Sequence, residues 1–174
     1  MSSINRHQQC GCVWYSLVTE KKEKLYVRPI GAKKERRIRA GVILHSIKDD
    51  KFLLVETYHQ HLGFPKGGQE KGESLAETAS RELKEETGIE IPAKELDQLK
   101  RYSYGGGTTY FYYPFFDFPD QWNCLSIDPN PENDVTGNGW ISFACFRDDP
   151  KSNSHLRKFV KEMMKKRAFS RNRR

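Results

Sequence analysis

Three glutamates at helical spacing stand out in the middle of the chain. Glu82, Glu85 and Glu86 occupy positions i, i+3 and i+4, which places their carboxylates on one face of an α-helix. Like charges so placed repel each other by a few tenths of a kcal/mol per pair. The arrangement is unfavourable unless a positive charge lies among the carboxylates. A hard divalent cation would supply that charge, so the spacing predicts a metal site.

The sequence around these glutamates predicts the helix that positions them. Apolar residues recur at every fourth position from Leu75 to Leu83, which gives the helix a face that can pack against a core. Ser74 is a suitable N-cap, and Gly88 is a stop signal for the helix. We therefore expect a helix over residues 75–87, with the carboxylates on a different face from the apolar residues.

The whole segment resembles the signature of the Nudix hydrolases. Gly67 is followed after five residues by Glu73, and after seven more by the run RELKEETGI from Arg81 to Ile89. A solvated amphipathic helix is the ordinary alternative for a charged stripe, but so many constrained positions at fixed spacing disfavour it. The resemblance implies an α/β fold, namely a Nudix-type α/β/α sandwich with a mixed sheet. It also implies metal-dependent hydrolysis of phosphoanhydride bonds in nucleoside diphosphates linked to another group.

The resemblance implies a set of metal ligands. Glu82, Glu85 and Glu86 are the expected ligands, and the family adds the carbonyl oxygen of Gly67. Mg²⁺ or Mn²⁺ suits ligation by oxygen alone, whereas zinc usually takes histidine and cysteine. A bound divalent ion would neutralise phosphate charge and make a water nucleophilic.

Further residues near the signature are expected to organise the site or bind substrate. In the family, the positions of Glu73 and Arg81 tie the loop to the helix and hold the metal ligands in place. An exposed Arg81 that pairs with Glu77 or Glu85 is compatible with that role. Lys66 lies beside the metal-binding turn and can reach a substrate phosphate.

The general base is left open between the signature and a loop. Glu85 or Glu86 can activate the water, but related enzymes sometimes use a carboxylate from a loop outside the signature. Glu132 and Asp134 are the loop candidates, with simple solvated acids as the ordinary alternative. All four residues are therefore candidate catalytic groups.

The positive charge of the chain is concentrated near its C-terminus. Residues 157–174 hold nine basic side chains and one acid, whereas residues 1–156 carry a net charge of −1. Such clustering suits a polyanionic partner, either an RNA 5′ end or a nucleotide polyphosphate, without DNA sequence specificity. The expected substrate contacts come from this segment and from a second basic cluster: Lys161, Lys165, Lys166, Lys33, Arg37 and Arg39.

Length and composition limit the classes of protein to which the chain can belong. The 174 residues fit a single domain over residues 1–168 with a basic tail over residues 169–174. No apolar run approaches the ~18 residues of a membrane span, and the N-terminus lacks an apolar signal core, so we expect a cytoplasmic protein. Cys10 and Cys12 suggest half of a zinc site, but reduced, partly buried thiols are the better interpretation.

Alternating and continuous apolar segments predict the elements around the helix. We expect an N-terminal hairpin, two further strand pairs, a last strand and an amphipathic closing helix. Their expected ranges are 10–18 with 25–30, 38–47 with 51–58, 99–104 with 108–118, 140–146 and 154–168.

The flanks of the signature indicate a substrate class. The segment from Gly63 to Gly67 resembles that of Nudix mRNA-decapping enzymes, and its Phe-Pro-Lys-Gly-Gly also resembles bacterial RNA pyrophosphohydrolases. These resemblances imply RNA 5′-end decapping, which releases a nucleoside diphosphate and leaves a 5′-monophosphate. The alternatives are hydrolysis of a dinucleoside polyphosphate or diphosphoinositol polyphosphate, or RNA binding by an inactive Nudix scaffold.

Aromatic residues near the predicted site offer surfaces on which a base can stack. Base–aromatic stacking is worth about 1–3 kcal/mol per base. The ordinary alternative is packing within the core. The candidates are Tyr102, Tyr104, Tyr110, Tyr112, Trp14 and Trp122.

Overall fold

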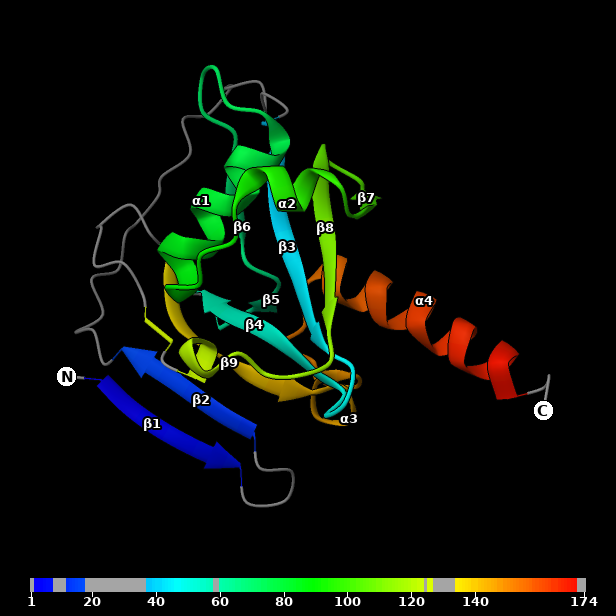
Figure 1. Ribbon diagram of the computed structural model, residues 1–174. Coiled ribbons are helices and arrows are strands. Elements are labelled where there is room, and N and C mark those ends of the chain that lie inside the picture. The colour runs from blue at the N-terminus through cyan, green and yellow to red at the C-terminus, as the bar shows by residue number, and fades with distance from the viewer. Residues whose placement is uncertain are drawn as a thin grey trace, which may run out of the picture.

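The computed structural model describes residues 2–7, 12–17, 37–57, 60–123, 125–126 and 134–171. These residues form one mixed sheet with helices on both faces (Figure 1). The strands are β1 (Ser2–His7), β2 (Cys12–Leu17), β3 (Arg39–Ser46), β4 (Lys51–Thr57), β5 (Leu62–Gly63), β6 (Lys66–Gly68), β7 (Lys100–Tyr104), β8 (Thr108–Phe115) and β9 (Val135–Ser142). The helices are α1 (Leu75–Thr87), α2 (Ala93–Asp97), a 3₁₀ turn η1 (Asp120–Asn123), α3 (Phe143–Phe146) and α4 (Ser154–Arg171).

The sheet is mixed because β3 runs parallel to β8 and antiparallel to its other partners. The strand order is β1-β2-β9-β4-β3-β8-β7, with β5 added to β4 and β6 added to β3. β3 and β4 pair only through His45 with Phe52 and Ser46 with Lys51. Beyond that point β3 takes β6 as its partner, while β4 takes β5. The short strand β6 thereby lies next to β3 and in contact with α1.

Alternation along β3 divides the core into two layers. Ala40, Val42 and Leu44 pack with the apolar side of α1, whereas Ile43 packs with the apolar side of α4. In Figure 1, α1 and α2 cross in front of β3, and α4 begins behind the sheet and runs toward the C-terminus. The predicted α/β/α sandwich with a mixed sheet is therefore confirmed.

The structure confirms the helix that was expected over residues 75–87. Its N-cap Ser74 forms a capping box with Glu77, in which the Ser74 side chain accepts from the Glu77 backbone and the Glu77 side chain accepts from the Ser74 backbone. Gly88 ends the helix in the left-handed conformation at φ 76°, which glycine adopts without strain. The expected closing helix is also present as α4 and extends to Arg171.

Two expected strand assignments differ from the structure. The last strand was placed at residues 140–146, but β9 occupies Val135–Ser142 and residues 143–146 form the helix α3. Phe143 and Phe146 both point into the α4-side core, which one helical turn achieves and an extended strand does not. The N-terminal hairpin is formed by β1 and β2, while residues 25–30 lie outside the described residues.

Several short elements were not predicted, among them β5, β6 and α2. These three have two, three and five residues, so none is long enough to show a hydrophobic period. The expected metal-binding turn beside Lys66 contains the strand β6, which pairs with Arg39, Ala40 and Gly41 of β3. Among the described residues, none of the helices has the length and apolar character needed to cross a membrane.

Candidate functional site

Arg81 lies at the centre of a hydrogen-bonded cluster on α1. Its Nη2 donates to the carbonyl oxygen of Gly68 at 2.9 Å, which ties the helix to β6. Its Nη1 donates to Glu82 at 2.8 Å and to Glu85 at 3.2 Å. One guanidinium thus offsets part of the charge of two neighbouring carboxylates and fixes the loop that precedes the helix.

Glu73 holds Arg81 from the other side. Its carboxylate accepts from Nε of Arg81 at 2.7 Å and from Nη2 at 3.1 Å, a bidentate pair that fixes the plane of the guanidinium. The Glu70 backbone and the Thr78 hydroxyl donate to the same carboxylate. These hydrogen bonds, led by Arg81, lower the pKa of Glu73 to about 2.

Glu82 is packed against the backbone of the preceding strand. A Cβ atom at Gly67 would lie 2.0–2.1 Å from the carboxylate atoms of Glu82, so only glycine leaves room for that side chain. The Glu82 side chain is 12% exposed, and burial raises its pKa although Arg81 opposes the rise. The structure therefore brings together Gly67 and Glu82, two of the residues that the sequence selects as metal ligands.

Glu86 is the buried member of the glutamate cluster. Its side chain accepts from the backbone N–H of Lys66 at 2.9 Å, and the residue is 6% exposed. Burial raises the pKa of Glu86 well above its ordinary value; the charge of Lys66 opposes this rise, and the charges of Glu82 and Asp134 add to it. Asp134 thus lies near enough to Glu86 to affect it electrostatically, whereas Glu132 lies outside the described residues.

The donor chemistry of this cluster fits a hard divalent cation. Glu82, Glu85 and Glu86 offer only oxygen atoms, and two of them have a raised pKa because their charge is poorly solvated. Among the described residues, no three acidic, histidine or cysteine side chains already form a metal cage. In this structure Arg81 holds Glu82 and Glu85, while the Lys66 backbone holds Glu86.

Asn138 is a site residue that the sequence does not reveal. Its Nδ2 donates to the carbonyl oxygen of Glu86 at 2.9 Å and to that of Ser126 at 3.0 Å. The residue is fully buried, and its Oδ1 has no hydrogen-bond partner among the described residues. Asn138 therefore joins β9 to the end of α1 where the catalytic candidates lie, and no motif around it signals that contact.

A group of basic side chains, which we call the basic rim, lies near the start of α4. It consists of Arg39, Lys66 and Lys158, and its charges act together on His155. Burial lowers the pKa of His155, and these three cations lower it further. His155 also contacts the carbonyl oxygen of Gly105 at 3.3 Å. The sequence selects Arg39 and Lys66, but it gives no signal that the fold brings Lys158 and His155 beside them.

The other predicted substrate contacts lie farther along α4, just before β3 or outside the described residues. Lys161 and Lys165 are exposed on α4, and Lys166 donates to the Tyr102 hydroxyl at 3.0 Å. Arg37 is exposed just before β3. Lys33 lies outside the described residues. The structure thus places Arg39 and Lys66 in the basic rim and leaves the remaining lysines on a helix that extends away from it.

Several aromatic residues expected to be available for stacking are core residues. Tyr110 is fully buried and Trp122 is 6% exposed, so the prediction that they offer an open face is wrong. Tyr104 is also buried and stacks on His155. Tyr102, Tyr112 and Trp14 are half-buried. The physical reason is that strand residues alternate, and the inward positions of β8 complete the two core layers.

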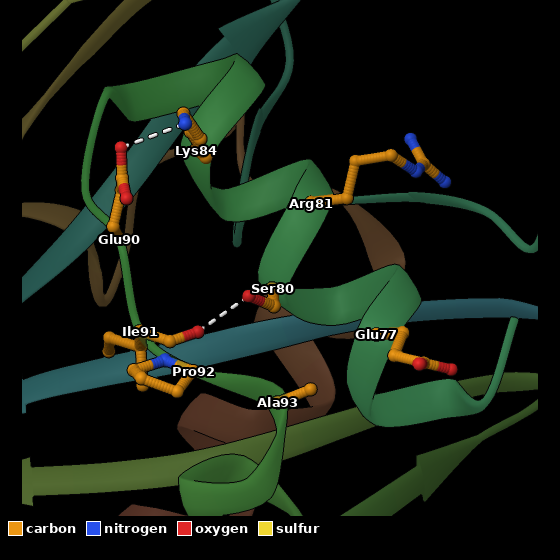
Figure 2. Close-up of a pocket in the computed structure, with 8 residues that line it drawn as sticks. All are labelled: Glu77, Ser80, Arg81, Lys84, Glu90, Ile91, Pro92 and Ala93. Carbon is orange, nitrogen blue, oxygen red and sulfur yellow. Dashed lines mark hydrogen bonds and ion pairs between the residues drawn. The ribbon is translucent and has the colours of Figure 1, made fainter.

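A surface pocket next to α1 is separate from the carboxylate cluster. Figure 2 shows it between α1 and residues 90–93, with Ser80 and Lys84 lining its helical side. Lys84 pairs with Glu90 at 2.8 Å, and the Ser80 hydroxyl donates to the carbonyl oxygen of Ile91. The guanidinium of Arg81 points away from this pocket in Figure 2. The carboxylate cluster therefore lies on a different side of α1.

The comparisons with known proteins agree with this arrangement. A family model described as the NUDIX domain matches residues 35–163. The chain belongs to the Nudix family. It is therefore a hydrolase of phosphoanhydride substrates, in a family that uses divalent metal ions.

Relatives of this Nudix chain include viral and bacterial proteins. Putative hydrolase 111R of Invertebrate iridescent virus 3 is 32% identical over 136 residues, which are 78% of this chain and 75% of the relative. The ADP compounds hydrolase NudE of Escherichia coli K12 is 41% identical over 70 residues, which are 37% of each protein. The NUDIX domain of Shewanella oneidensis NrtR, solved with ADP ribose, shares the fold with a TM-score of 0.55 and 18% identity, covering 85% of this chain and 98% of that chain.

Proposed function

We propose that Glu82, Glu85 and Glu86, with the carbonyl oxygen of Gly67, hold Mg²⁺ or Mn²⁺ at the junction of α1 and β6. The support is the partly buried, oxygen-only cluster and the clash that a side chain at position 67 would make with the Glu82 carboxylate. When bound, the ion neutralises phosphate charge and lowers the pKa of a coordinated water.

The chain's own residues supply positioning and charge around that reaction. Arg81 and Glu73 hold the glutamates in a fixed arrangement, so little reorganisation is needed during the reaction. Lys66 places a positive charge beside Glu86 and contacts a phosphate of the substrate. Glu85 or Glu86 takes a proton from the attacking water, with Asp134 as the loop alternative near the same position.

We further propose that the substrate is capped RNA, cleaved to a nucleoside diphosphate and a 5′-monophosphate end. The observation that carries this proposal is a row of exposed lysines, Lys158, Lys161 and Lys165, along one side of α4. They span about 10 Å of helix. The row begins at the basic rim beside the glutamate site, so it can follow a phosphate backbone past the cleaved bond. A small nucleotide has no backbone to reach Lys165.

A direct comparison of substrates tests this proposal. The protein with Mg²⁺ or Mn²⁺ is given capped RNA, triphosphorylated RNA, free cap dinucleotide, a dinucleoside tetraphosphate and a diphosphoinositol polyphosphate. We expect the highest kcat/KM for capped RNA. A higher value for either small polyphosphate would replace RNA decapping with the corresponding small-molecule activity, and ADP compounds would then be the next class to test, as the name of NudE suggests.

Charge removal on α4 tests the same proposal from the protein side. Replacing Lys158, Lys161 and Lys165 with alanine should raise KM for long capped RNA about tenfold or more. It should also reduce the salt slope of binding by roughly 0.7 for each lost contact, because fewer counterions are released. Cleavage of free cap dinucleotide should hardly change.

A matched control removes three cations from other exposed positions, Lys94, Arg101 and Arg147. This variant has the same net charge but keeps the row on α4. We expect its KM for capped RNA to stay close to that of the parent protein. If both variants lose RNA affinity equally, overall charge and not the row on α4 determines binding, and the proposed path is wrong.

A further inference from the structure

Two cysteines that are far apart in sequence lie close together near Ser142, the residue at which β9 ends. Cys12 lies in β2 and Cys145 lies in α3, and their Sγ atoms are 3.9 Å apart. Cys12 is 3% exposed, whereas Cys145 is half-buried. They come together because β2 pairs with β9 and α3 follows β9 directly. The sequence suggests a zinc half-site from Cys10 and Cys12, but it does not indicate this contact.

Ser142 lies between the two sulfur atoms. Its backbone N–H donates to Cys12 Sγ at 3.2 Å, and its hydroxyl donates to Cys145 Sγ at 3.1 Å. Donors that point at sulfur stabilise the negatively charged thiolate relative to the thiol. The thiolate is the form that reacts with oxidants. One residue therefore contacts both sulfur atoms and holds them next to each other.

We propose that Cys12 and Cys145 are a redox modification site that forms a disulfide in the presence of a peroxide. The site is separate from the glutamate cluster and does not depend on the proposed substrate. Ser142, at its centre, ends β9, whereas Asn138 earlier on the same strand contacts Glu86. The half-buried Cys145 is open to a small oxidant, and the buried Cys12 is positioned to react with the product.

The reaction balances with hydrogen peroxide as the oxidant. The Cys145 thiolate attacks one peroxide oxygen, the O–O bond breaks, and the leaving hydroxide takes a proton to become water, which leaves a sulfenic acid on Cys145. The Cys12 sulfur then attacks the Cys145 sulfur as a thiolate, and the S–O bond breaks. The departing hydroxide takes the proton released by Cys12 and leaves as the second water. Two thiols lose two electrons, and one peroxide gains them.

The disulfide would fasten the N-terminal hairpin to the core. It joins positions 133 residues apart, and a long closed loop restricts the unfolded chain more than a short one. We therefore expect the melting temperature to rise on oxidation, by on the order of 10 °C. The same change would reverse with a dithiol reductant.

Peptide mapping of the full chain tests the proposal. The C10S/C124S variant keeps only Cys12 and Cys145, which trypsin separates into peptides 7–21 and 102–147. After treatment with hydrogen peroxide and alkylation of remaining thiols, we expect these two peptides to be linked and to separate on reduction. Fragmentation of the linked peptide from the unsubstituted protein should locate the bond at the same two sulfurs, so the test does not depend on the variant's folding.

The controls distinguish the disulfide from other thiol chemistry. C12S and C145S, each combined with C10S/C124S, should show no linked peptide and no oxidative rise in melting temperature. Separate alkylation of both peptides after peroxide treatment would overturn the proposal. So would stoichiometric zinc in the purified protein that is lost in C12S, because the thiols would then be metal ligands.

Discussion

At the carboxylate cluster, single charged side chains lower the stability of the fold while they provide groups for the reaction. Glu86 is buried beside Glu82 and Asp134, an arrangement that opposes its ionisation in the isolated fold. The charge and the backbone N–H of Lys66 compensate part of that cost. Strongly perturbed pKa values cluster at functional sites. The effects of the Glu86 charge on stability and on activity can be measured separately by replacing Glu86 with an uncharged side chain of the same shape.

Glu86→Gln should separate activity from stability. The amide oxygen can still accept from Lys66, so the helix end should remain intact, and loss of a buried charge should leave the melting temperature equal or higher. The loss of a ligand charge should lower kcat by roughly 10²–10³-fold or more. The control is Glu90→Gln, because Glu90 is exposed and pairs only with Lys84 among the contacts described here. Near-normal turnover of Glu86→Gln would remove Glu86 from the proposed ligand set.

The lowered pKa of Glu73 predicts that part of the unfolding free energy is lost in acid. Its pKa is lowered from 4.5 to about 2 in the folded protein, so the unfolded state binds the proton more tightly. Its contribution is therefore complete above pH 4.5 and is lost as the pH falls toward 2. Urea unfolding at pH 5.5 and pH 3 should show a smaller drop in unfolding free energy for Glu73→Gln than for the parent protein. Equal drops would show that Glu73 has no such linkage.

At the level of elements, the sequence predicts what is long and periodic. The helix α1 carries its own boundary signals in Ser74 and Gly88, so its position is predicted correctly. The strands β3, β4 and β8 show clear apolar or aromatic runs and are also predicted, as is β7 ahead of its glycine turn. The strand β1 has the sequence SSINRH, whose apolar content is too low to signal a strand, and it is defined by pairing with β2.

The candidate site shows the same division between local and long-range information. Glu73, Arg81 and the three glutamates belong to one continuous motif, so the spacing of the glutamates and the resemblance to the Nudix signature reveal them. Asn138 and Lys158 reach the site from β9 and α4, and only the sheet order and helix packing bring them there. A single sequence contains no local pattern that records those contacts. The burial of Tyr110 is likewise decided by the layer to which its strand position points.

The junction between β6 and α1 can be tested with two adjacent glycines. Gly67→Ala places a Cβ against the Glu82 carboxylate, which must then move, and we expect kcat/KM to fall by about 10²-fold because the ligand is displaced. Gly68→Ala is the matched control, since a Cβ there meets no atom within 4 Å. Its activity should stay close to that of the parent. Similar losses of activity in both variants would show that position 67 needs glycine for backbone flexibility and not for the space that Glu82 occupies.

At the level of the whole molecule, α4 runs along the sheet from the basic rim to the β3–β4 turn. It begins beside the basic rim, and its last turns reach the β3–β4 turn through Arg167. The Arg167 guanidinium binds the Asp50 carboxylate with two hydrogen bonds of 2.9 and 2.6 Å and lies over the ring of Phe143. Arg167, together with the contact of Lys166 with Tyr102, therefore holds the distal part of the helix more than apolar packing does, because the buried residues of α4 are concentrated in its first half.

Arg167→Ala should loosen the distal half of α4 without affecting the glutamate site. Both partners are partly exposed, so the bidentate pair and the cation–π contact together should contribute only about 1 kcal/mol to unfolding free energy. That corresponds to a fall in melting temperature of about 2–4 °C. Hydrogen exchange should increase in the last turns of α4, while hydrolysis of a free nucleotide substrate should stay unchanged. Arg157→Ala, which removes an exposed cation of the same helix that does not belong to the lysine row, is the control.

If RNA follows the row on α4, Arg167→Ala should also raise KM for long RNA, because a less firmly held helix presents its lysines less rigidly. An unchanged KM together with faster exchange would mean that the row binds RNA without needing the anchor.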